Sequence, residues 1–144
     1  MYDTELHTYK TYSKDDLEYR YRHSKLKDTT HLFVVSATFD ITPPITPPTD
    51  ARLFRKDKQP GGWSCGSFFA NPEGTSAGKL IEEVGLKGRA IGGIRISERH
   101  GNFFLNDGTA TYKDVLELKE LAKNTVREKF NIELHEEVRI ITNR

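Results

Sequence analysis

The sequence contains 144 residues, enough for one domain or for one domain and part of another. Hydrophobic residues make up 35% and charged residues 30%, which is typical of a protein with a modest packed core and argues against intrinsic disorder. The formal net charge of +1 gives no general reason to expect binding to nucleic acid or to an anionic membrane. No stretch approaches the length of apolar sequence that spans a membrane.

Cellular location can be inferred from the single cysteine, Cys65, and from the N-terminal residues. One cysteine cannot form an internal disulfide, which favours a reducing compartment. The opening residues, MYDTELHTYK, lack the apolar core of a secretory signal. We therefore expect a cytoplasmic protein.

The first predicted elements in chain order are a short helix and a strand. Ser13 is a suitable N-cap for a helical turn within residues 13–19. Residues 31–41, HLFVVSATFDI, are rich in β-branched and aromatic side chains and predict a strand.

A proline-rich segment, TPPITPPT, follows that strand. Its prolines can neither continue a helix nor donate hydrogen bonds to a sheet, so the segment predicts an extended connector. We therefore expect a first domain at residues 1–41, a linker at 42–50 and a second domain at 51–144.

The second domain contains two predicted helices. Ser76 can cap a helix over AGKLIEEV, whose apolar residues share one face, and Gly85 can end it. A longer helix is expected at about residues 111–130, where Thr111 and Asp114 approximate a capping box.

Strands are predicted around IGGIRIS (91–97), around NFFLN (102–106) and at residues 136–141. Asn-Asp-Gly at 106–108 is a strong turn signal. Because the strands and helices do not alternate regularly, the sequence predicts an α+β fold. We expect a small mixed or antiparallel sheet with two helices on one face.

The glycine-rich loop at residues 61–72, GGWSCGSFFANP, is the first candidate functional segment. Glycines allow a backbone to approach a ligand closely, although an ordinary surface turn explains the same composition. A phosphate-binding loop is excluded, because Leu80 stands after Lys79 where a magnesium-binding hydroxyl is required.

Basic residues precede this loop at Arg55, Lys56 and Lys58. Cations beside exposed backbone N–H groups suit a diphosphate, while a solvated charge run is the common alternative.

Three further constellations are weaker. The histidines are scattered, with one cysteine to join them, so no metal site is predicted. Cys65 could act as a nucleophile, but a small buried thiol is the simpler interpretation. Residues 19–22, YRYR, interleave aromatics and cations and could stack on bases, but four residues are too few to support nucleic-acid binding.

Several segments together resemble one family, the UDP-N-acetylenolpyruvoylglucosamine reductases. The resemblance lies in QPGGWSCGSFFANP, AGKLIEEVGLKGRAIGG, HGNFFLNDGTAT and FNIELHEEVRI, which occur in the order of that family's C-terminal region. Upstream, YRHSKLK resembles a segment near the end of the family's flavin domain. The match spans roughly residues 18 to 141.

The resemblance implies a cytoplasmic oxidoreductase of peptidoglycan synthesis, and hence a role in cell-wall biogenesis, cell shape and cell division. Such an enzyme uses FAD and NADPH to reduce UDP-N-acetylglucosamine enolpyruvate to UDP-N-acetylmuramate. Residues 1–41 would then be the C-terminal remnant of the FAD-binding domain, and residues 51–144 the substrate-binding domain.

The family's three catalytic positions fall on Arg22, Ser67 and Glu137. Its substrate-binding positions are expected at Arg55, Lys58, Asn71 and His100, and its cofactor contacts at Tyr21 and Gly66.

These residue types suit the implied chemistry. Hydride addition to the enolpyruvyl group places negative charge on C2 and the adjoining carboxylate, which Arg22 and a protonated Glu137 could stabilise. Ser67 could then protonate C2.

Two departures from the family pattern stand out. Ala70 replaces a lysine that is common in the family's GSFFKNP segment, and most of the flavin domain is missing from the sequence. We therefore expect the chain to be inactive alone and to need the N-terminal FAD-binding half as a partner. The alternative is a stand-alone UDP-sugar-binding module without redox activity.

Overall fold

The computed structural model describes residues 1–41, 53, 57 and 59–141. The chain divides into two compact units, Met1–Pro47 and Pro48–Arg144. The predicted linker at residues 42–50 lies outside the described residues, and the domain limits stay a prediction.

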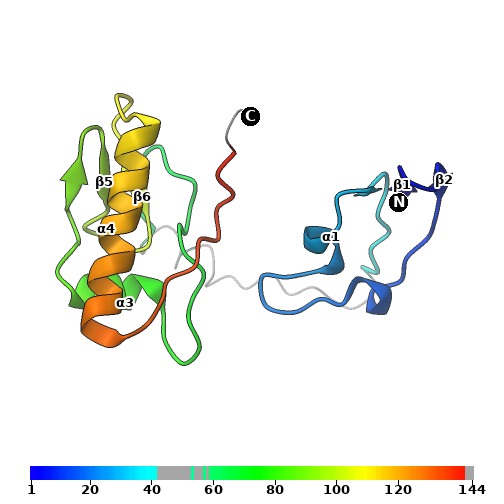
Figure 1. Ribbon diagram of the computed structural model, residues 1–144, viewed down its shortest axis with the longest axis horizontal. Helices are drawn as coiled ribbons and strands as arrows, with labels where there is room; N and C mark the ends of the chain where they lie inside the picture. The colour runs from blue at the N-terminus through cyan, green and yellow to red at the C-terminus, as the bar shows by residue number, and fades with distance from the viewer. Residues whose placement is uncertain (42–52, 54–56, 58, 142–144) are drawn as a thin grey trace. The chain divides into compact units, whose positions relative to one another are not determined.

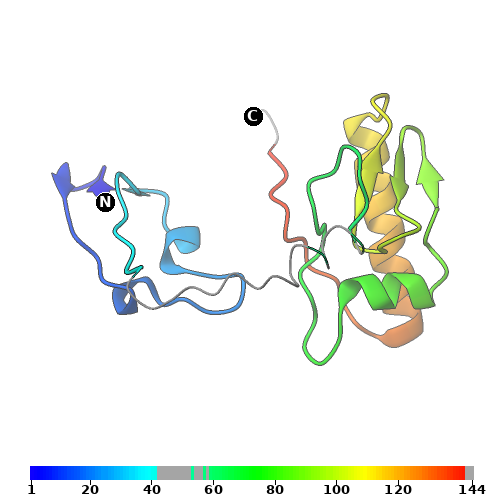
Figure 2. The same ribbon diagram turned by 180° about the vertical axis from the view of Figure 1, so that it is seen from behind.

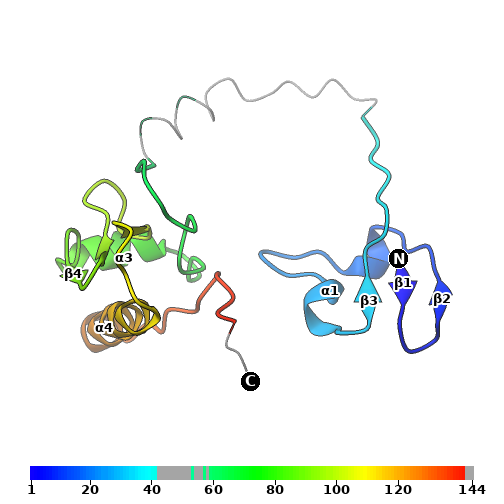
Figure 3. The same cartoon turned by 90° about the horizontal axis from the view of Figure 1, so that it is seen from above.

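The first unit is built on a small antiparallel sheet. Its strands are β1 (Tyr2–Asp3), β2 (Thr8–Tyr9) and β3 (Leu32–Phe33), in the order β2-β1-β3. Figure 3 shows β1 between its two neighbours. A 3-10 helix, η1 (Asp15–Leu17), and a single-turn helix, α1 (Lys25–Asp28), occupy the chain between β2 and β3.

The predicted strand at residues 31–41 is largely wrong. Only Leu32 and Phe33 pair in the sheet, and residues 34–41 form no regular structure. Side chains beyond the strand are exposed, 79% for Phe39 and 77% for Ile41. The β-forming residue types are present, but no described neighbour pairs with their backbone, so local preference alone does not extend the strand.

The second unit contains an antiparallel sheet of β4 (Ala90–Ile91), β5 (Ile94–Ile96) and β6 (Phe104–Asn106), in that order. The segment IGGIRIS, predicted as one strand, therefore folds as a hairpin. The glycine pair at 92–93 turns the chain between β4 and β5.

Both predicted helices are confirmed, with their caps. Helix α3 (Ala77–Glu83) begins at Ser76, whose hydroxyl accepts the N–H of Lys79, and it is followed by Gly85 at φ +73°. Helix α4 (Tyr112–Phe130) begins at Thr111, where Thr111 and Asp114 form a complete capping box.

Helix α4 lies across the sheet and contacts β4 and β5 (Figure 1). Seen from behind in Figure 2, α3 runs crosswise to α4, and the Lys129 Nζ donates to the Glu83 carbonyl at 2.5 Å to join their C-terminal ends. Helix α4 therefore packs on the sheet, as predicted. Helix α3 instead packs against α4.

The core of this unit lies between α4, α3, the sheet and the loop that carries Phe68 and Phe69. Leu118, Ala122 and Val126 supply the α4 stripe at helical spacing and are fully buried. The three phenylalanines at 68, 69 and 104 pack as a cluster, with the rings of Phe68 and Phe104 stacked at 4.2 Å.

The predicted strand at 136–141 is also wrong. Glu136 forms one isolated bridge, and the following residues to 141 are irregular. The fold of the second unit is thus a small α/β arrangement with an antiparallel sheet, as predicted in its coarse form.

Candidate active site

The loop at residues 61–72 crosses the second unit as an irregular strand. Isolated antiparallel bridges join Trp63 to Asn106, Ser67 to Phe103 and Phe69 to Glu136. The loop therefore borders the 103–106 segment on one stretch and the C-terminal segment on the next. Ser67 is half-buried at the point where the loop passes from the first of these neighbours to the second.

The buried side chain of Asn102 fixes this loop by hydrogen bonds to the loop backbone. Its side chain is 2% exposed, accepts the N–H of Phe69 at 2.8 Å and donates to the Phe69 carbonyl at 2.7 Å. Its own carbonyl accepts the N–H of Phe68, also at 2.8 Å. A buried amide that is satisfied on both sides fixes the backbone immediately after Ser67.

Glu137 is tied to the same stretch of loop by its backbone. Glu137 and Val138 both donate their N–H groups to the Phe68 carbonyl, at 2.9 and 3.4 Å, which is the pattern of a β-bulge. The Ala70 N–H donates to the His135 carbonyl at 2.9 Å on the other side of the bridge. The structure thus brings the backbone of Glu137 beside the residue that follows Ser67.

Asn71 lies at the end of the loop, exposed, and its side-chain oxygen accepts the N–H of Ala77 at 3.1 Å. It therefore helps to join the loop to the start of α3. This contact is a structural role that the prediction of substrate binding at Asn71 did not include.

His100 lies on the turn between β5 and β6 and is half-buried. Burial lowers the pKa of the His100 imidazole, which favours the neutral ring, and its Nδ1 accepts the N–H of Asn102 at 3.2 Å. It lines a pocket of about 230 Å³ with residues of α3 and of its own turn. Among the described residues, neither Ser67 nor Glu137 lines that pocket.

Arg22 and Tyr21 lie in the first unit. Both are exposed, Arg22 has φ +54°, and its guanidinium lies 5.7 Å from the centre of the Tyr21 ring. The Arg22 carbonyl accepts the Nζ of Lys27 at 2.7 Å. The grouping of Arg22 with Ser67 and Glu137 stays a prediction.

Gly66 and Cys65 immediately precede Ser67. Gly66 has φ +84°, a conformation that glycine adopts without strain. Cys65 is exposed, so the expectation of a buried thiol is wrong. Partial desolvation still raises the pKa of its thiol, which lowers the thiolate fraction and counts against a nucleophilic role.

The remaining predicted positions, Arg55 and Lys58, lie outside the described residues. Within the described ranges, no three His, Cys, Asp or Glu side chains gather closely enough to hold a metal ion. In the same part of the chain, no helix has the length and apolar character needed to cross a membrane.

Comparison with known proteins identifies the family of the chain. Residues 57–141 match the family defined as UDP-N-acetylenolpyruvoylglucosamine reductase, C-terminal domain. The chain belongs to this family. The match covers the glycine-rich loop, helices α3 and α4 and the segment that carries Glu137.

Individual reductases share extensive identity with the chain. A UDP-N-acetylenolpyruvoylglucosamine reductase from Synechococcus sp. is 46% identical over 136 residues, which cover 90% of this chain and 44% of that protein. The reductase from Lactobacillus helveticus is 40% identical over 92% of this chain and 46% of its own length. The chain therefore spans less than half the length of these relatives.

A solved structure is also similar. The crystal structure of the reductase (MurB) from Thermus caldophilus superposes with a TM-score of 0.52 at 45% sequence identity. That match covers 61% of this chain and 30% of the Thermus chain.

Two residues of the site were missed from sequence. Asn102 adjoins the apolar residues Phe103, Phe104 and Leu105. A buried amide needs hydrogen-bond partners, so this position could have indicated a structural role for Asn102. Glu136 carries no such signal, because it looks like one more charged residue beside Glu137.

Proposed function

We propose that the chain is the substrate-binding part of a flavin-dependent reductase of peptidoglycan synthesis. In this proposal it acts on UDP-N-acetylglucosamine enolpyruvate and forms UDP-N-acetylmuramate in the cytoplasm, with NADPH as the reductant. The single observation that supports it most directly is the backbone pairing of Glu137 with Phe68, next to Ser67, within the matched family region.

The proposed roles follow from the residue types. Ser67 would donate its hydroxyl proton to C2 of the enolpyruvyl group as negative charge collects there. Glu137, if protonated, would donate a hydrogen bond to the substrate carboxylate, and Arg22 would contact the same carboxylate as a permanent cation. Arg55, Lys58, Asn71 and His100 are proposed to hold the rest of the nucleotide sugar.

The described residues fit the flavin only in part. Tyr21 offers an exposed ring and Gly66 an open backbone, which suit edge contacts with a flavin. A dinucleotide needs many more contacts than these two, so we propose that the N-terminal half of the longer relatives supplies them. When bound, FAD supplies the hydride, and the residues of this chain hold the substrate and deliver the proton.

Purification of the chain alone, and together with the N-terminal portion of the Synechococcus reductase, tests this proposal. We expect the chain alone to be colourless and inactive, and the two parts together to bind FAD and to oxidise NADPH only when the enolpyruvyl substrate is present. Calorimetry of the chain alone with that substrate measures binding separately from redox activity.

A chain that binds FAD alone would contradict the proposed division of the flavin site. Substrate binding by the chain, without activity in any combination that binds FAD, would instead favour a UDP-sugar-binding module. Binding to an oligonucleotide that weakens with salt, without binding of the nucleotide sugar, would contradict both.

A further inference from the structure

The side chain of Glu136 lies between two lysines of α4. Its carboxylate is 3.1 Å from the Nζ of Lys123 and 3.3 Å from the Nζ of Lys119. All three side chains are largely covered, with exposures of 24% for Glu136, 20% for Lys123 and 15% for Lys119. Partly buried pairs of this kind are screened less by salt than pairs on the open surface.

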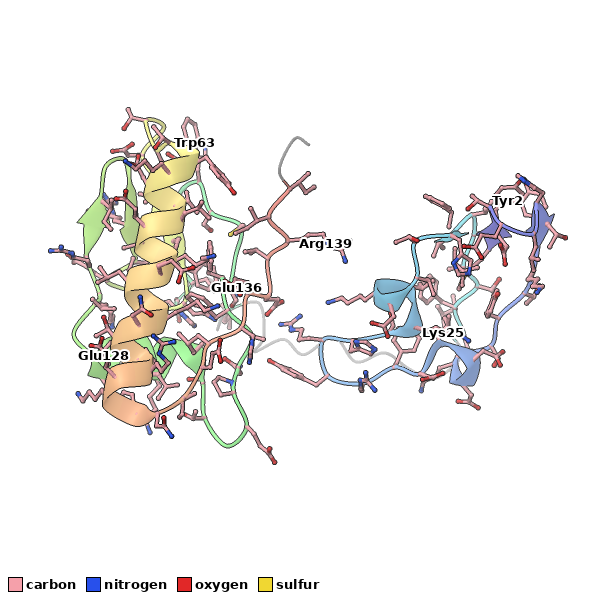
Figure 4. The ribbon with its side chains drawn as sticks, viewed as in Figure 1. Tyr2, Lys25, Trp63, Glu128, Glu136 and Arg139 are labelled. Atoms are coloured by element: carbon pink, nitrogen blue, oxygen red, sulfur yellow. The ribbon has the colours of Figure 1, made fainter. Side chains whose placement is uncertain are left out.

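The segment that carries Glu136 has little other regular support. After α4 ends, residues 131–141 form no helix or strand, and a single bridge to Phe69 defines their register against the loop. Leu134 is fully buried and anchors the segment from the core. Figure 4 shows Glu136 on this segment, between α4 and Arg139.

Because Glu136 and Glu137 are adjacent glutamates, the segment has one alternative register, shifted by one residue. In an extended chain successive side chains point to opposite faces, so a slip by one residue exchanges them. A slip here would place Glu137 where Glu136 now meets the lysines, with the same charge. The same slip would put His135 into the buried position of Leu134. Leu134 therefore selects the observed register, and the ion pairs of Glu136, two residues further along the chain, hold the segment in it.

We infer that Glu136 is a positioning residue, whose ion pairs with Lys119 and Lys123 hold the register in which Glu137 is bonded to Phe68 beside Ser67. This inference rests on the proposed function in so far as Glu137 contacts substrate. Glu136 itself takes no part in the proposed chemical step. Its effect passes through the backbone of the next residue.

Two electrostatic observations agree with this geometry. Partial burial alone would raise the pKa of the Glu136 carboxyl, but hydrogen bonding to its own backbone N–H and the contacts with Lys123 and Lys119 lower it overall. Hydrogen bonds to Glu120 and Glu136 raise the pKa of Lys119. At neutral pH the Glu136 carboxylate and the Lys119 ammonium are therefore both charged.

Amide hydrogen exchange on the chain itself tests the positioning role, with Glu136→Gln as the variant and Glu117→Gln as the matched control. Glu117 pairs with Lys113 on the same helix at 3.6 Å, but Lys113 is 83% exposed. Because a hydrogen bond to a charged group is worth roughly tenfold in a local equilibrium, we expect the Glu137 and Ala70 amides to exchange about tenfold faster in Glu136→Gln. The amides of Leu118, Ala122 and Val126 should keep their rates.

A second arm measures turnover in the enzyme assembled from this chain and the N-terminal portion of a relative. We expect Glu136→Gln to lower kcat with KM unchanged, Glu136→Asp to restore part of the loss, and Glu117→Gln to leave kcat unchanged. Unchanged exchange at Glu137 would overturn the inference. A uniform rise across the core amides, or unchanged kcat despite faster exchange, would overturn it as well. Failure of the proposed function would appear as an inactive assembly of the unmodified chain, whereas failure of this inference appears only in the variants.

Discussion

At the scale of single residues, the described site depends on backbone contacts more than on side-chain chemistry. Ser67 is itself bridged to Phe103, and the Asn102 amide fixes the residues that follow it. Glu137 is bonded through its amide to the Phe68 carbonyl. The loop can therefore present a hydroxyl in a defined place although it belongs to no regular strand, and this rigidity is what proton transfer to a defined carbon requires.

Ser67→Ala removes the proposed proton donor without removing a backbone contact. In the assembled enzyme we expect formation of UDP-N-acetylmuramate to fall by at least about 100-fold, the usual contribution of a general acid, while substrate binding is kept. Product chromatography and calorimetry measure the two effects. Ser64→Ala, in the exposed part of the same loop, is the control, and full turnover by Ser67→Ala would remove Ser67 from the mechanism.

Gly93 illustrates a residue with a purely steric requirement. A Cβ at this buried position would overlap the Ala110 backbone nitrogen and the Thr109 hydroxyl, in the turn before α4. We expect Gly93→Ala to lower the free energy of unfolding by about 1–3 kcal/mol, the usual cost of overpacking. Gly61→Ala, where no atom lies within 4 Å, should change the urea midpoint little; equal effects of the two substitutions would contradict this account.

At the scale of elements, the N-terminus of α4 connects the helix to the hairpin. The Asp114 carboxylate accepts the Thr111 N–H at 2.8 Å, and the Thr111 hydroxyl accepts the Asp114 N–H at 3.2 Å. Hydrogen bonding from Thr111 and, more weakly, from the Gly93 N–H lowers the pKa of Asp114. The cap thus joins α4 to the turn between β4 and β5, and a negative charge there also suits the helix dipole.

Removal of this cap should destabilise the second unit in a pH-dependent way. Thr111→Ala is expected to cost about 1 kcal/mol at neutral pH, as is usual for the loss of an N-cap. Because the pKa of Asp114 is lowered on folding, its charge stabilises the folded state above the unfolded pKa, and this contribution is lost as the pH falls through the folded pKa, below about 4.

Thermal melts across that range measure the effect. The difference in Tm between the unmodified chain and Asp114→Asn should be largest at neutral pH and should shrink on the acid side of about pH 4. Glu128→Gln, at an exposed position in the last turn of the same helix, is the control. A Tm difference that is independent of pH would contradict the role given to the Asp114 charge.

At the scale of the whole molecule, the two units differ in how much core they contain. In the second unit a continuous cluster joins the loop, α3, the sheet and α4. Of the described residues in the first unit, Leu17 is the single buried hydrophobic side chain, while Phe33, Phe39 and Ile41 are exposed. Since buried apolar area is the main source of stability, the first unit has little of its own.

This contrast predicts two levels of local stability in one chain. Hydrogen exchange should be slowest at Leu118, Ala122 and Val126, which are fully buried, and should be fast at the paired residues of β1 and β3. In the assembled enzyme, protection of β1 and β3 should rise if the N-terminal half covers them. Equal protection of both units in the chain alone would show that the first unit has support beyond the described contacts.

The sequence by itself determined the elements whose signals are local. Helices α3 and α4 begin at the residues expected from their caps, and the Asn-Asp-Gly turn occurs where predicted, because capping and turn chemistry act over a few neighbouring residues. The motifs around Ser67 and Glu137 likewise indicated the family without any coordinates.

Only the tertiary structure decided the rest. The stretches at 34–41 and 137–141 contain strand-forming residues, yet neither pairs as a regular strand, because a strand needs a partner that the local sequence does not specify. The partners of Asn102 and Glu136 are backbone and lysine groups more than ten residues away, so no local pattern could identify those partners. Long-range hydrogen bonds and ion pairs, which form only when distant segments meet, determine where Glu137 lies.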